Sequence, residues 1–322
     1  MSHLFKWHGG KSVSACNIDI STEEGFLLLD RLQKIRSIVK KYGEEKFYQS
    51  YSGGKDSVVL SHLLDMALPD NQIPRIFINT GIELNMIRDF VFEQAKNDER
   101  IVIIQPQVPI KPMLEKEGYP FKSKNHARLV ERFQRLGMAD SIKSYLGYGN
   151  WGPGLCCPQK LKYQFTEDMS LKISDHCCIK MKEEPLENWS RQHNKPYALI
   201  GIMPDEGGRR RTAKCLSFQR KKLKAFQPLT AVDKNWEDWF IKEYQITICD
   251  IYKPPYNSKR TGCKGCPFAL HLQDELDMLE QYFPAERKQC EIIWKPVYDE
   301  YRRIGYRLKK GYEQYKQLSL FD

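Results

Sequence analysis

A glycine-rich turn at residues 52–57, with the sequence SGGKDS, constrains the fold more than any other feature of the chain. Residues 46–49 before it are typical of a short β-strand, and apolar residues at helical spacing follow it over residues 58–64. Because glycine has no Cβ, the backbone N–H groups of such a turn can surround an anion, and the positive end of the next helix points at the same place. Two serine hydroxyls and the charge of Lys55 add to this. The turn therefore predicts a loop that holds a phosphate.

The same string resembles the pyrophosphate loop of the adenine nucleotide α-hydrolase superfamily. That group includes ATP pyrophosphatases, tRNA thiolation enzymes and sulfonucleotide reductases. The string differs from the P-loop of kinases and GTPases, which needs four residues between its glycines. The resemblance implies an adenine nucleotide bound at Ser52, Gly53, Gly54, Lys55, Asp56 and Ser57. The alternative is a glycine-rich turn that binds nothing.

The composition is typical of a soluble globular protein with anionic partners. Hydrophobic residues make up 41% of the 322, and no apolar run approaches the roughly 20 residues that span a bilayer. The first eight residues lack the apolar core of a secretion signal, so we expect a cytoplasmic protein without a membrane partner. The formal net charge of +10 favours nucleotides or nucleic acid, although a solvated surface charge would look the same.

Predicted strands and helices alternate along much of the chain. Amphipathic periodicity predicts a helix over residues 23–42, and apolar runs predict strands at 75–79, 101–104 and 197–202, with a helix at about 83–96. This order implies an α/β fold with a doubly wound parallel sheet, which binds ligands at the carboxyl ends of its strands. We expect a helical insertion at about 112–151 and a helical C-terminal region, with helices at 274–293 and about 296–315.

The ten cysteines point to metal or redox chemistry. Without a secretion signal, they are expected to bind metal or act in catalysis rather than form disulfides. They include adjacent pairs at 156–157 and 177–178 and a Cys-x-x-Cys motif at 263–266. Thiolates from two separate segments can enclose an iron–sulfur cluster, and zinc would accept the same four sulfurs.

Several motifs in one order resemble the phosphoadenosine phosphosulfate (and adenosine phosphosulfate) reductase family. They are a tandem cysteine pair followed by Lys and Pro-Leu at 177–186, Gly-x-x-x-Asp-Glu at 201–206, a Trp-containing helix at 236–241 and Gly-Cys-x-x-Cys-Pro at 262–267. With the loop, the similarity covers roughly residues 46–268. In cluster-bearing members such cysteines hold a 4Fe–4S cluster, which by resemblance assigns Cys177, Cys178, Cys263 and Cys266 as ligands. Cys156 and Cys157 are the alternative pair, with a less complete motif.

The resemblance also implies further residues of the nucleotide site at the ends of two predicted strands. Residues 79–83 look like the Asp-Thr-Gly segment that approaches adenosine, with asparagine in place of aspartate. The loop at residues 204–211, after the strand predicted at 197–202, is basic. It suits oxyanion recognition, because guanidinium groups bind phosphate in a bidentate fashion. An exposed basic turn is the alternative. The implied nucleotide residues are Asn79, Thr80, Gly81, Glu83, Gly201, Asp205, Glu206, Arg209, Arg210 and Arg211.

Two departures argue against ordinary sulfate assimilation. Reductases of this family end in Glu-Cys-Gly-Leu-His, whose cysteine attacks the sulfate sulfur, and this chain has no such motif. Met203 also stands where the family commonly places arginine. A relative with the loop and the cluster but without that tail looks like the ATP pyrophosphatase of DNA phosphorothioation. It would adenylate an oxygen of its substrate and release pyrophosphate, with Mg²⁺, Lys55 and Arg210 neutralising charge and Asp56 orienting the metal.

Two other functions remain open from the sequence. An atypical reductase of adenylyl sulfate or phosphoadenylyl sulfate would use Cys156 or Cys157 as its thiol and release sulfite. A nucleic-acid-binding or clamp-binding module would carry a vestigial nucleotide site. Sulfur transfer would involve a cysteine desulfurase or a thiol reductant as partner.

The C-terminal residues Gln317–Phe321, with the sequence QLSLF, resemble the peptide by which bacterial proteins dock on the replication sliding clamp. A tail packed on its own domain is the alternative. Docking there would fit an enzyme that acts on DNA. The predicted organisation is an N-terminal helical segment (1–45), a nucleotide-binding domain with the iron–sulfur cysteines (46–268), a helical C-terminal region (269–315) and a tail (316–322).

Overall fold

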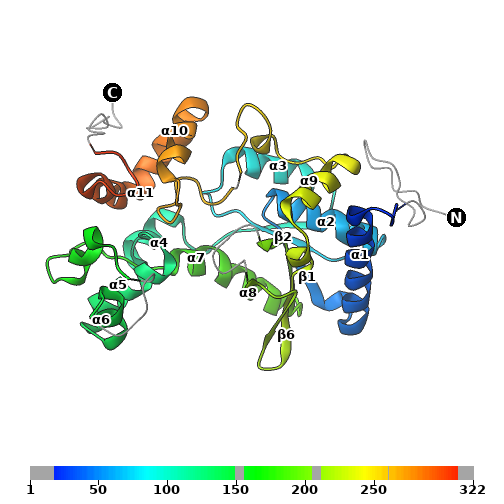
Figure 1. Cartoon of the computed structure of the whole chain (residues 1–322), viewed down its shortest axis with the longest axis horizontal. Helices are drawn as coiled ribbons and strands as arrows, with labels where there is room; N and C mark the ends of the chain where they lie inside the picture. Colours follow the sequence, from blue (N-terminus) through cyan, green and yellow to red (C-terminus); the bar gives the residue numbers. More distant parts are fainter. Residues whose placement is uncertain (1–17, 149–155, 205–211, 260, 311–322) are drawn as a thin grey trace. The chain divides into compact units, whose positions relative to one another are not determined.

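The computed structural model describes residues 18–148, 156–204, 212–259 and 261–310 (Figure 1). The chain divides into two compact units. The sheet unit consists of residues 1–79, 85–105 and 185–260, and the helical unit of residues 80–84, 106–184 and 261–322. Each unit combines segments that are far apart in the sequence.

A six-stranded sheet, counted over the described residues, forms the centre of the sheet unit. Its strand order is β3-β2-β1-β4-β6-β5. All neighbouring pairs are parallel except β5 and β6, which pair antiparallel at one edge. The strands are β1 (Phe47–Ser50), β2 (Arg75–Ile78), β3 (Ile101–Ile104), β4 (Tyr197–Ile200), β5 (Leu216–Gln219) and β6 (Lys222–Phe226). The predicted α/β fold with a parallel sheet is confirmed.

Helices cover both faces of this sheet. Alternate side chains of β1 show the two faces: Phe47 packs in the larger core with α1, α2 and α9, whereas Tyr48 packs against Trp189 of α8. Figure 1 shows α1, α2 and α9 side by side, in agreement with their packing. The elements are α1 (Glu23–Tyr42), α2 (Lys55–Ala67), α3 (Asn85–Ala95), α8 (Glu184–Gln192), α9 (Lys234–Glu243) and the 3₁₀ turns η2 (Glu44–Lys46), η7 (Pro228–Ala231) and η8 (Asp250–Tyr252).

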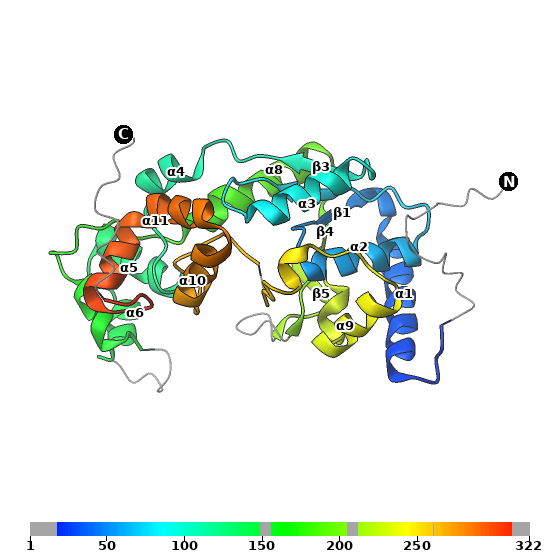
Figure 2. The ribbon, with the colours of Figure 1, turned by 90° about the horizontal axis from the view of Figure 1, so that it is seen from above.

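The helical unit contains the predicted insertion and the C-terminal helices. Figure 2 shows α5 beside α6, and α10 beside α11. A short parallel bridge joins Tyr119 to Ile173, and an antiparallel bridge joins Glu83 to Cys263. The elements are α4 (Ile110–Glu117), α5 (Lys124–Leu136), α6 (Asp140–Leu146), η3 (Gln159–Phe165), α7 (His176–Cys178), the π-helical turn η4 (Ile179–Glu183), α10 (Leu272–Tyr282) and α11 (Pro284–Ile304).

The boundary between the last two helices differs from the prediction. The sequence places the break before Pro296, but Pro296 lies inside α11 and the break falls at Phe283. Pro284 occupies the first turn of α11, where a missing N–H costs nothing because that group has no partner within the helix. Within the described parts of the chain, no helix combines the length and apolar character needed to cross a membrane.

Candidate functional site

The SGGKDS turn forms the predicted connection between β1 and α2. β1 ends at Ser50, Gly54 caps α2, and Lys55 is the first residue of that helix. Gly53 has a φ of +69°, and a Cβ there would lie 2.4 Å from Cγ2 of Val91 on α3. Both the backbone conformation and the close approach of α3 therefore require glycine at this position.

Hydrogen bonds within the turn hold its shape. The Ser57 hydroxyl donates to the carbonyl of Gly54 (2.8 Å), and the Gly54 N–H donates to the Ser52 hydroxyl (3.2 Å). The two serine hydroxyl oxygens lie 3.1 Å apart. Gly201, just after β4, passes close to the same turn, since a Cβ on it would lie 2.7 Å from the Asp56 carbonyl oxygen. These contacts fix the conformation of the turn.

Lys55 is paired with two carboxylates of α9. Its ammonium nitrogen lies 2.7 Å from Oε2 of Glu237 and 2.8 Å from Oδ1 of Asp238. Burial lowers the pKa of Lys55, but the hydrogen bonds to Asp238 and Glu237 outweigh burial and raise it. The lysine stays charged, as a phosphate ligand must.

Glu237 is a site residue that the sequence did not single out. Its side chain is only 2% exposed, and within the described residues its Oε1 has no hydrogen-bond partner. Burial, with the neighbouring Asp56 carboxylate, raises the pKa of Glu237 to about 8, while Lys55 lowers it. The Trp-containing helix was visible in the sequence, but nothing there distinguished Glu237 from its other acidic residues. Asp56 and Glu237 together offer carboxylate oxygens of the kind that Mg²⁺ binds.

The other predicted nucleotide residues are divided between the units. Asn79 follows β2 in the sheet unit, and its N–H donates to the carbonyl of Ile104 (2.9 Å). Thr80, Gly81 and Glu83 belong to the helical unit. There the Glu83 carboxylate accepts from the Thr80 N–H (3.0 Å) and hydroxyl (2.7 Å). Asp205, Glu206, Arg209, Arg210, Arg211 and the tail Gln317–Phe321 lie outside the described residues.

The helical unit brings four predicted cysteines together. The thiol of Cys177 on α7 interacts with those of Cys178, Cys263 and Cys266, although 85 positions separate Cys178 from Cys263 in the chain. Two backbone interactions fix the segment that carries Cys263 and Cys266. One is the antiparallel bridge between Glu83 and Cys263, and in the other the Lys264 N–H donates to the Ile82 carbonyl (2.8 Å). The nine cysteines in the described part of the chain are all free of disulfides.

Two basic side chains favour thiolate at this cysteine group. The hydrogen bond from Cys177, together with Lys124 and Lys182, lowers the pKa of Cys178 to about 6 despite burial. The Cys263 thiolate in turn raises the pKa of Lys182, against the effect of burial. Lys182 also lies 3.7 Å from Oε1 of Glu83. The group can therefore supply the thiolate ligands that a soft metal centre requires.

Aromatic side chains of α11 hold the Cys263–Cys266 loop. Trp294 Nε1 donates to the Lys264 carbonyl (3.1 Å), the Tyr298 hydroxyl donates to the Gly265 carbonyl, and the Tyr301 hydroxyl donates to the Pro267 carbonyl (2.9 Å). Their side chains are almost completely buried. Because three successive parts of the loop are bonded to one helix, the loop presents its cysteines from a rigid support.

The alternative cysteine pair has different neighbours. Cys157 is buried, and its N–H donates to the Tyr145 carbonyl (2.7 Å). Burial raises the pKa of its thiol to about 11, with Lys122 and Tyr145 acting in the opposite direction. Cys156 is exposed. In the described residues, the interactions of Cys263 and Cys266 run to Cys178 and not to this pair.

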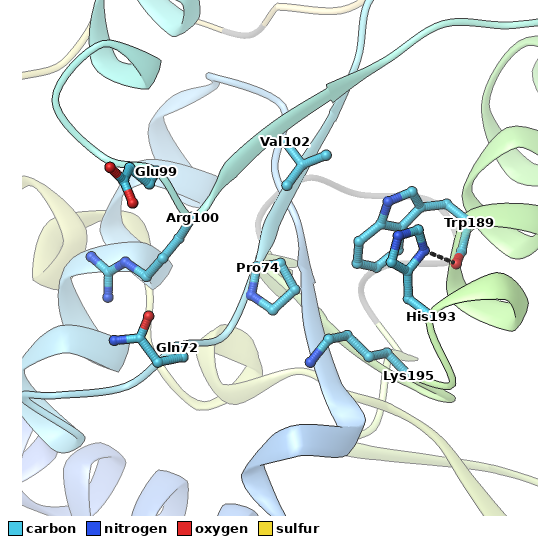
Figure 3. Close-up of a pocket in the computed structure, with 8 residues that line it drawn as sticks. All are labelled: Gln72, Pro74, Glu99, Arg100, Val102, Trp189, His193 and Lys195. Carbon is cyan, nitrogen blue, oxygen red and sulfur yellow. Dashed lines mark hydrogen bonds between the residues drawn. The ribbon is translucent and has the colours of Figure 1, made fainter.

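A cavity of about 380 Å³ lies elsewhere in the sheet unit (Figure 3). Pro74, Arg100 and Lys195 line it, and these residues precede β2, β3 and β4. The cavity therefore sits at the amino ends of the parallel strands, away from the edge where this class of sheet binds ligands. His193 stacks on Trp189 in its wall, with ring centroids 4.2 Å apart.

Comparison with known proteins supports the resemblance found in the sequence. Residues 46–148 match the family model for the phosphoadenosine phosphosulfate reductase domain, which covers the phosphate loop and β1 to β3. An uncharacterized protein of Methanocaldococcus jannaschii is 25% identical over an alignment of 307 positions, which covers 90% of this chain and 59% of the relative. The chain thus spans about three-fifths of the length of that relative.

Solved structures show more distant likenesses. The phosphoadenylyl-sulfate reductase of Candida auris, in a phosphate complex, is 15% identical with a TM-score of 0.44, over 79% of this chain and 98% of that one. The U34-tRNA thiolase of Methanococcus maripaludis, with its 4Fe–4S cluster, is 16% identical with a TM-score of 0.36, over 88% of this chain and 80% of that one. Both TM-scores lie below 0.5.

Proposed function

We propose that this protein is an iron–sulfur enzyme that uses ATP to adenylate its substrate for sulfur transfer, with release of pyrophosphate. The ordered turn at residues 52–57, with the charged Lys55 at the start of α2, is the observation that carries this proposal. Backbone N–H groups, serine hydroxyls and one ammonium group converge at a helix N-terminus, where a phosphate chain is favoured. Catalysis would consist of positioning and charge neutralisation.

A divalent cation would complete the nucleotide site. Asp56 and Glu237 are the side chains that would hold Mg²⁺, and the unpartnered Oε1 of Glu237 is the donor that fits it. The ion supplies charge neutralisation for the β- and γ-phosphate oxygens. Lys55 would then neutralise phosphate oxygens directly, which requires it to exchange its carboxylate partners for the nucleotide. Asp205, Glu206 and the arginines 209–211 remain proposed members of this site by resemblance.

The four cysteines fit an iron–sulfur cluster better than zinc. A tetrahedral zinc site with Zn–S bonds of about 2.3 Å places its sulfurs about 3.8 Å apart. The described residues contain one group of three or more ligand atoms within 4.8 Å of one another, and none of these sulfurs belongs to it. A 4Fe–4S cluster binds each cysteine to a different iron, so it accepts wider spacing. We propose Cys177, Cys178, Cys263 and Cys266 as its ligands.

The acceptor that we propose is DNA, as in phosphorothioation. Met203 stands where the reductase family commonly places arginine, and the net charge of +10 suits a polyanionic substrate. The competing function is sulfite release from adenylyl sulfate. It requires a reactive thiol, and the raised pKa of Cys157 leaves the exposed Cys156 as its candidate.

One experiment separates these functions. Protein purified without oxygen is incubated with DNA and a sulfide source, in turn with ATP, adenylyl sulfate and phosphoadenylyl sulfate, while pyrophosphate and sulfite are measured. We expect a brown, iron-containing protein that releases pyrophosphate from ATP only. Sulfite release from either sulfonucleotide with a thiol reductant would favour the reductase. Colourless protein with stoichiometric zinc would refute the cluster.

A further inference from the structure

We propose that Glu131, Asp175 and His176 bind a divalent transition-metal ion, of which zinc is the best match, at a site distinct from the four cysteines. All three residues belong to the helical unit. Glu131 lies on α5, His176 begins α7, and Asp175 precedes it. One oxygen of each carboxylate and one imidazole nitrogen lie within 4.8 Å of one another. This group is independent of the proposed ATP chemistry.

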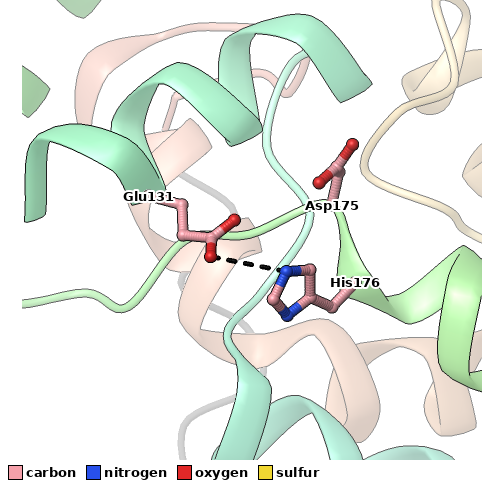
Figure 4. A group of neighbouring side chains, drawn as sticks. All are labelled: Glu131, Asp175 and His176. Carbon is pink, nitrogen blue, oxygen red and sulfur yellow. Dashed lines mark ion pairs between the residues drawn. The ribbon is translucent and has the colours of Figure 1, made fainter. Parts of the chain in front are cut away.

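The separation of the donor atoms matches a small tetrahedral ion. Nε2 of His176 lies 3.4 Å from Oε1 of Glu131, and Figure 4 shows the imidazole facing that carboxylate. Metal–ligand distances of about 2.1 Å in a tetrahedron place two donors about 3.4 Å apart. An ion could therefore sit between Nε2 and Oε1 with little movement of either side chain. Two carboxylates and a neutral imidazole also balance the charge of a divalent ion.

A fourth residue holds the imidazole in the orientation that metal binding needs. Nδ1 of His176 lies 3.2 Å from Oε2 of Glu117, the last residue of α4. A histidine that binds metal through one nitrogen commonly donates the N–H of the other to a carboxylate. With Nδ1–H donating to Glu117, the lone pair of Nε2 faces Glu131. A protonated histidine that only forms ion pairs with Glu117 and Glu131 is the competing interpretation.

The backbone around the group is fixed on both sides. Ile173 N–H donates to the Gln134 side-chain oxygen on α5 (3.2 Å), and the Gln134 amide donates to the Leu171 carbonyl (2.8 Å). Just beyond α4, the Ser174 N–H donates to the Tyr119 carbonyl (3.0 Å). These hydrogen bonds attach the segment before Asp175 and His176 to α5 and to the end of α4. The backbone that carries these two metal-binding side chains is therefore held in place.

The ligand types favour zinc over magnesium or calcium. Imidazole suits zinc and its neighbours in the first transition series, whereas magnesium and calcium prefer an all-oxygen shell. Three protein ligands leave one position for water. His176 immediately precedes Cys177, so an ion here would also fix the backbone of the pair Cys177–Cys178 to α5.

Cobalt(II) titration of the full-length protein tests this site, after removal of metal with a chelator and desalting. Cobalt on thiolates gives an intense ultraviolet charge-transfer band, whereas cobalt on imidazole and carboxylates gives only weak visible bands. With the iron–sulfur cluster retained on the four cysteines, we expect one cobalt per chain and no thiolate band in the difference spectrum, at a site that zinc competes for. His176→Gln should weaken this binding at least 100-fold, and Glu117→Gln by 10- to 100-fold because it only orients the ring.

Glu167→Gln removes an exposed carboxylate of the same unit and serves as the matched control, with unchanged cobalt affinity expected. Circular dichroism in chelator checks that each variant folds. If His176→Gln does not fold, the cobalt affinities of Glu131→Gln and Asp175→Asn test the proposal in its place. Cobalt uptake with the thiolate band only, or wild-type affinity in the folded variants, would overturn the proposal. The substitutions at the metal site are not expected to change ATP binding. A failure of the protein to bind ATP would therefore count against the proposed nucleotide site and not against this metal site.

Discussion

The ammonium nitrogen of Lys55 lies 2.7 Å from Oε2 of Glu237, a carboxylate that is 2% exposed. The pair joins the first residue of α2 to α9, which lies 182 residues further along the chain. The second oxygen of Glu237 has no hydrogen-bond partner among the described residues, and the neighbouring Asp56 carboxylate helps burial to raise the pKa of Glu237. One lysine and two carboxylates thus form a charge group beside the phosphate loop.

Glu237→Gln is expected to remove the contribution of Mg²⁺ to ATP binding. The amide keeps the size of the side chain but has only one acceptor oxygen and no charge, so a cation loses a ligand. Calorimetric titration with ATP, with and without Mg²⁺, measures the effect. Asp238→Asn is the matched control, because it removes the other carboxylate that pairs with Lys55 and that side chain is 58% exposed, not buried like Glu237. If Mg²⁺ strengthened ATP binding equally in Glu237→Gln and wild type, Glu237 would not be a ligand.

Cys178→Ser should abolish the brown colour and the bound iron, whereas Cys157→Ser should leave both at wild-type levels. Cys178 interacts with the Cys263 and Cys266 thiols, while the interactions of Cys157 run to Lys122 and Tyr145. Iron content and the visible spectrum after anaerobic purification give the answer. Equal bleaching by the two substitutions would mean that the wrong pair has been assigned.

Gly265→Ala should destabilise the protein by about 2–4 kcal/mol and reduce its iron content. Gly265 has a φ of +60°, and a Cβ there would lie 2.4 Å from the Tyr298 hydroxyl and 2.8 Å from Cys290 Sγ. Gly262→Ala is the matched control, because among the described residues other than its chain neighbours no atom lies within 4 Å of the added Cβ. Urea unfolding gives the free energies. Equal effects of the two substitutions would contradict the rigid support assigned to the loop.

His126 should make the protein less stable in acid. It is fully buried, its Nε2 lies 2.6 Å from the Gln164 side-chain oxygen, and burial lowers its pKa to about 4. An unfolded histidine titrates near 6.5, so between these values the unfolded state binds more protons and stability falls as the pH falls. The expected loss at pH 4 is about 3 kcal/mol.

Urea unfolding at pH 4 and pH 7 measures this loss for wild type, His126→Gln and His271→Gln. The first substitution should flatten the pH dependence over this range. The second should not, because the His271 side chain is 85% exposed. An unchanged slope in His126→Gln would show that other groups cause the acid sensitivity.

Local patterns predicted the parts of the fold that depend on local physics. The helix over residues 23–42 was predicted from its apolar period with the bounds that the structure has, and the structure shows Thr22 and Gly43 capping it. The turn between β1 and α2 was predicted because two glycines stand between a strand pattern and a helix pattern, and its binding of phosphate stays a prediction. The break before α11 was misplaced, because a proline is compatible with both a helix start and a helix interior that tertiary packing stabilises.

The sequence patterns did not predict which distant residues lie close together in the structure. Glu237 is one of several acidic residues around α9, and only its burial against Lys55 distinguishes it. Glu131 and His176 are 45 positions apart with no motif spacing, so their approach appears only when α5 and α7 are placed. The resemblance assigned four cysteines to one cluster; the structure places their thiols within interaction distance, and their role as ligands stays a prediction.

The most direct test of the central claim is a calorimetric ATP titration of Lys55→Met beside Lys242→Met, which removes an exposed charge from α9. A charge-assisted bond to phosphate contributes about 1.5–3 kcal/mol, so the loop variant should bind ATP about 10- to 100-fold more weakly while the control binds as wild type. Equal ATP affinity in wild type and folded Lys55→Met would contradict the claim that this loop grips the phosphates of an adenine nucleotide.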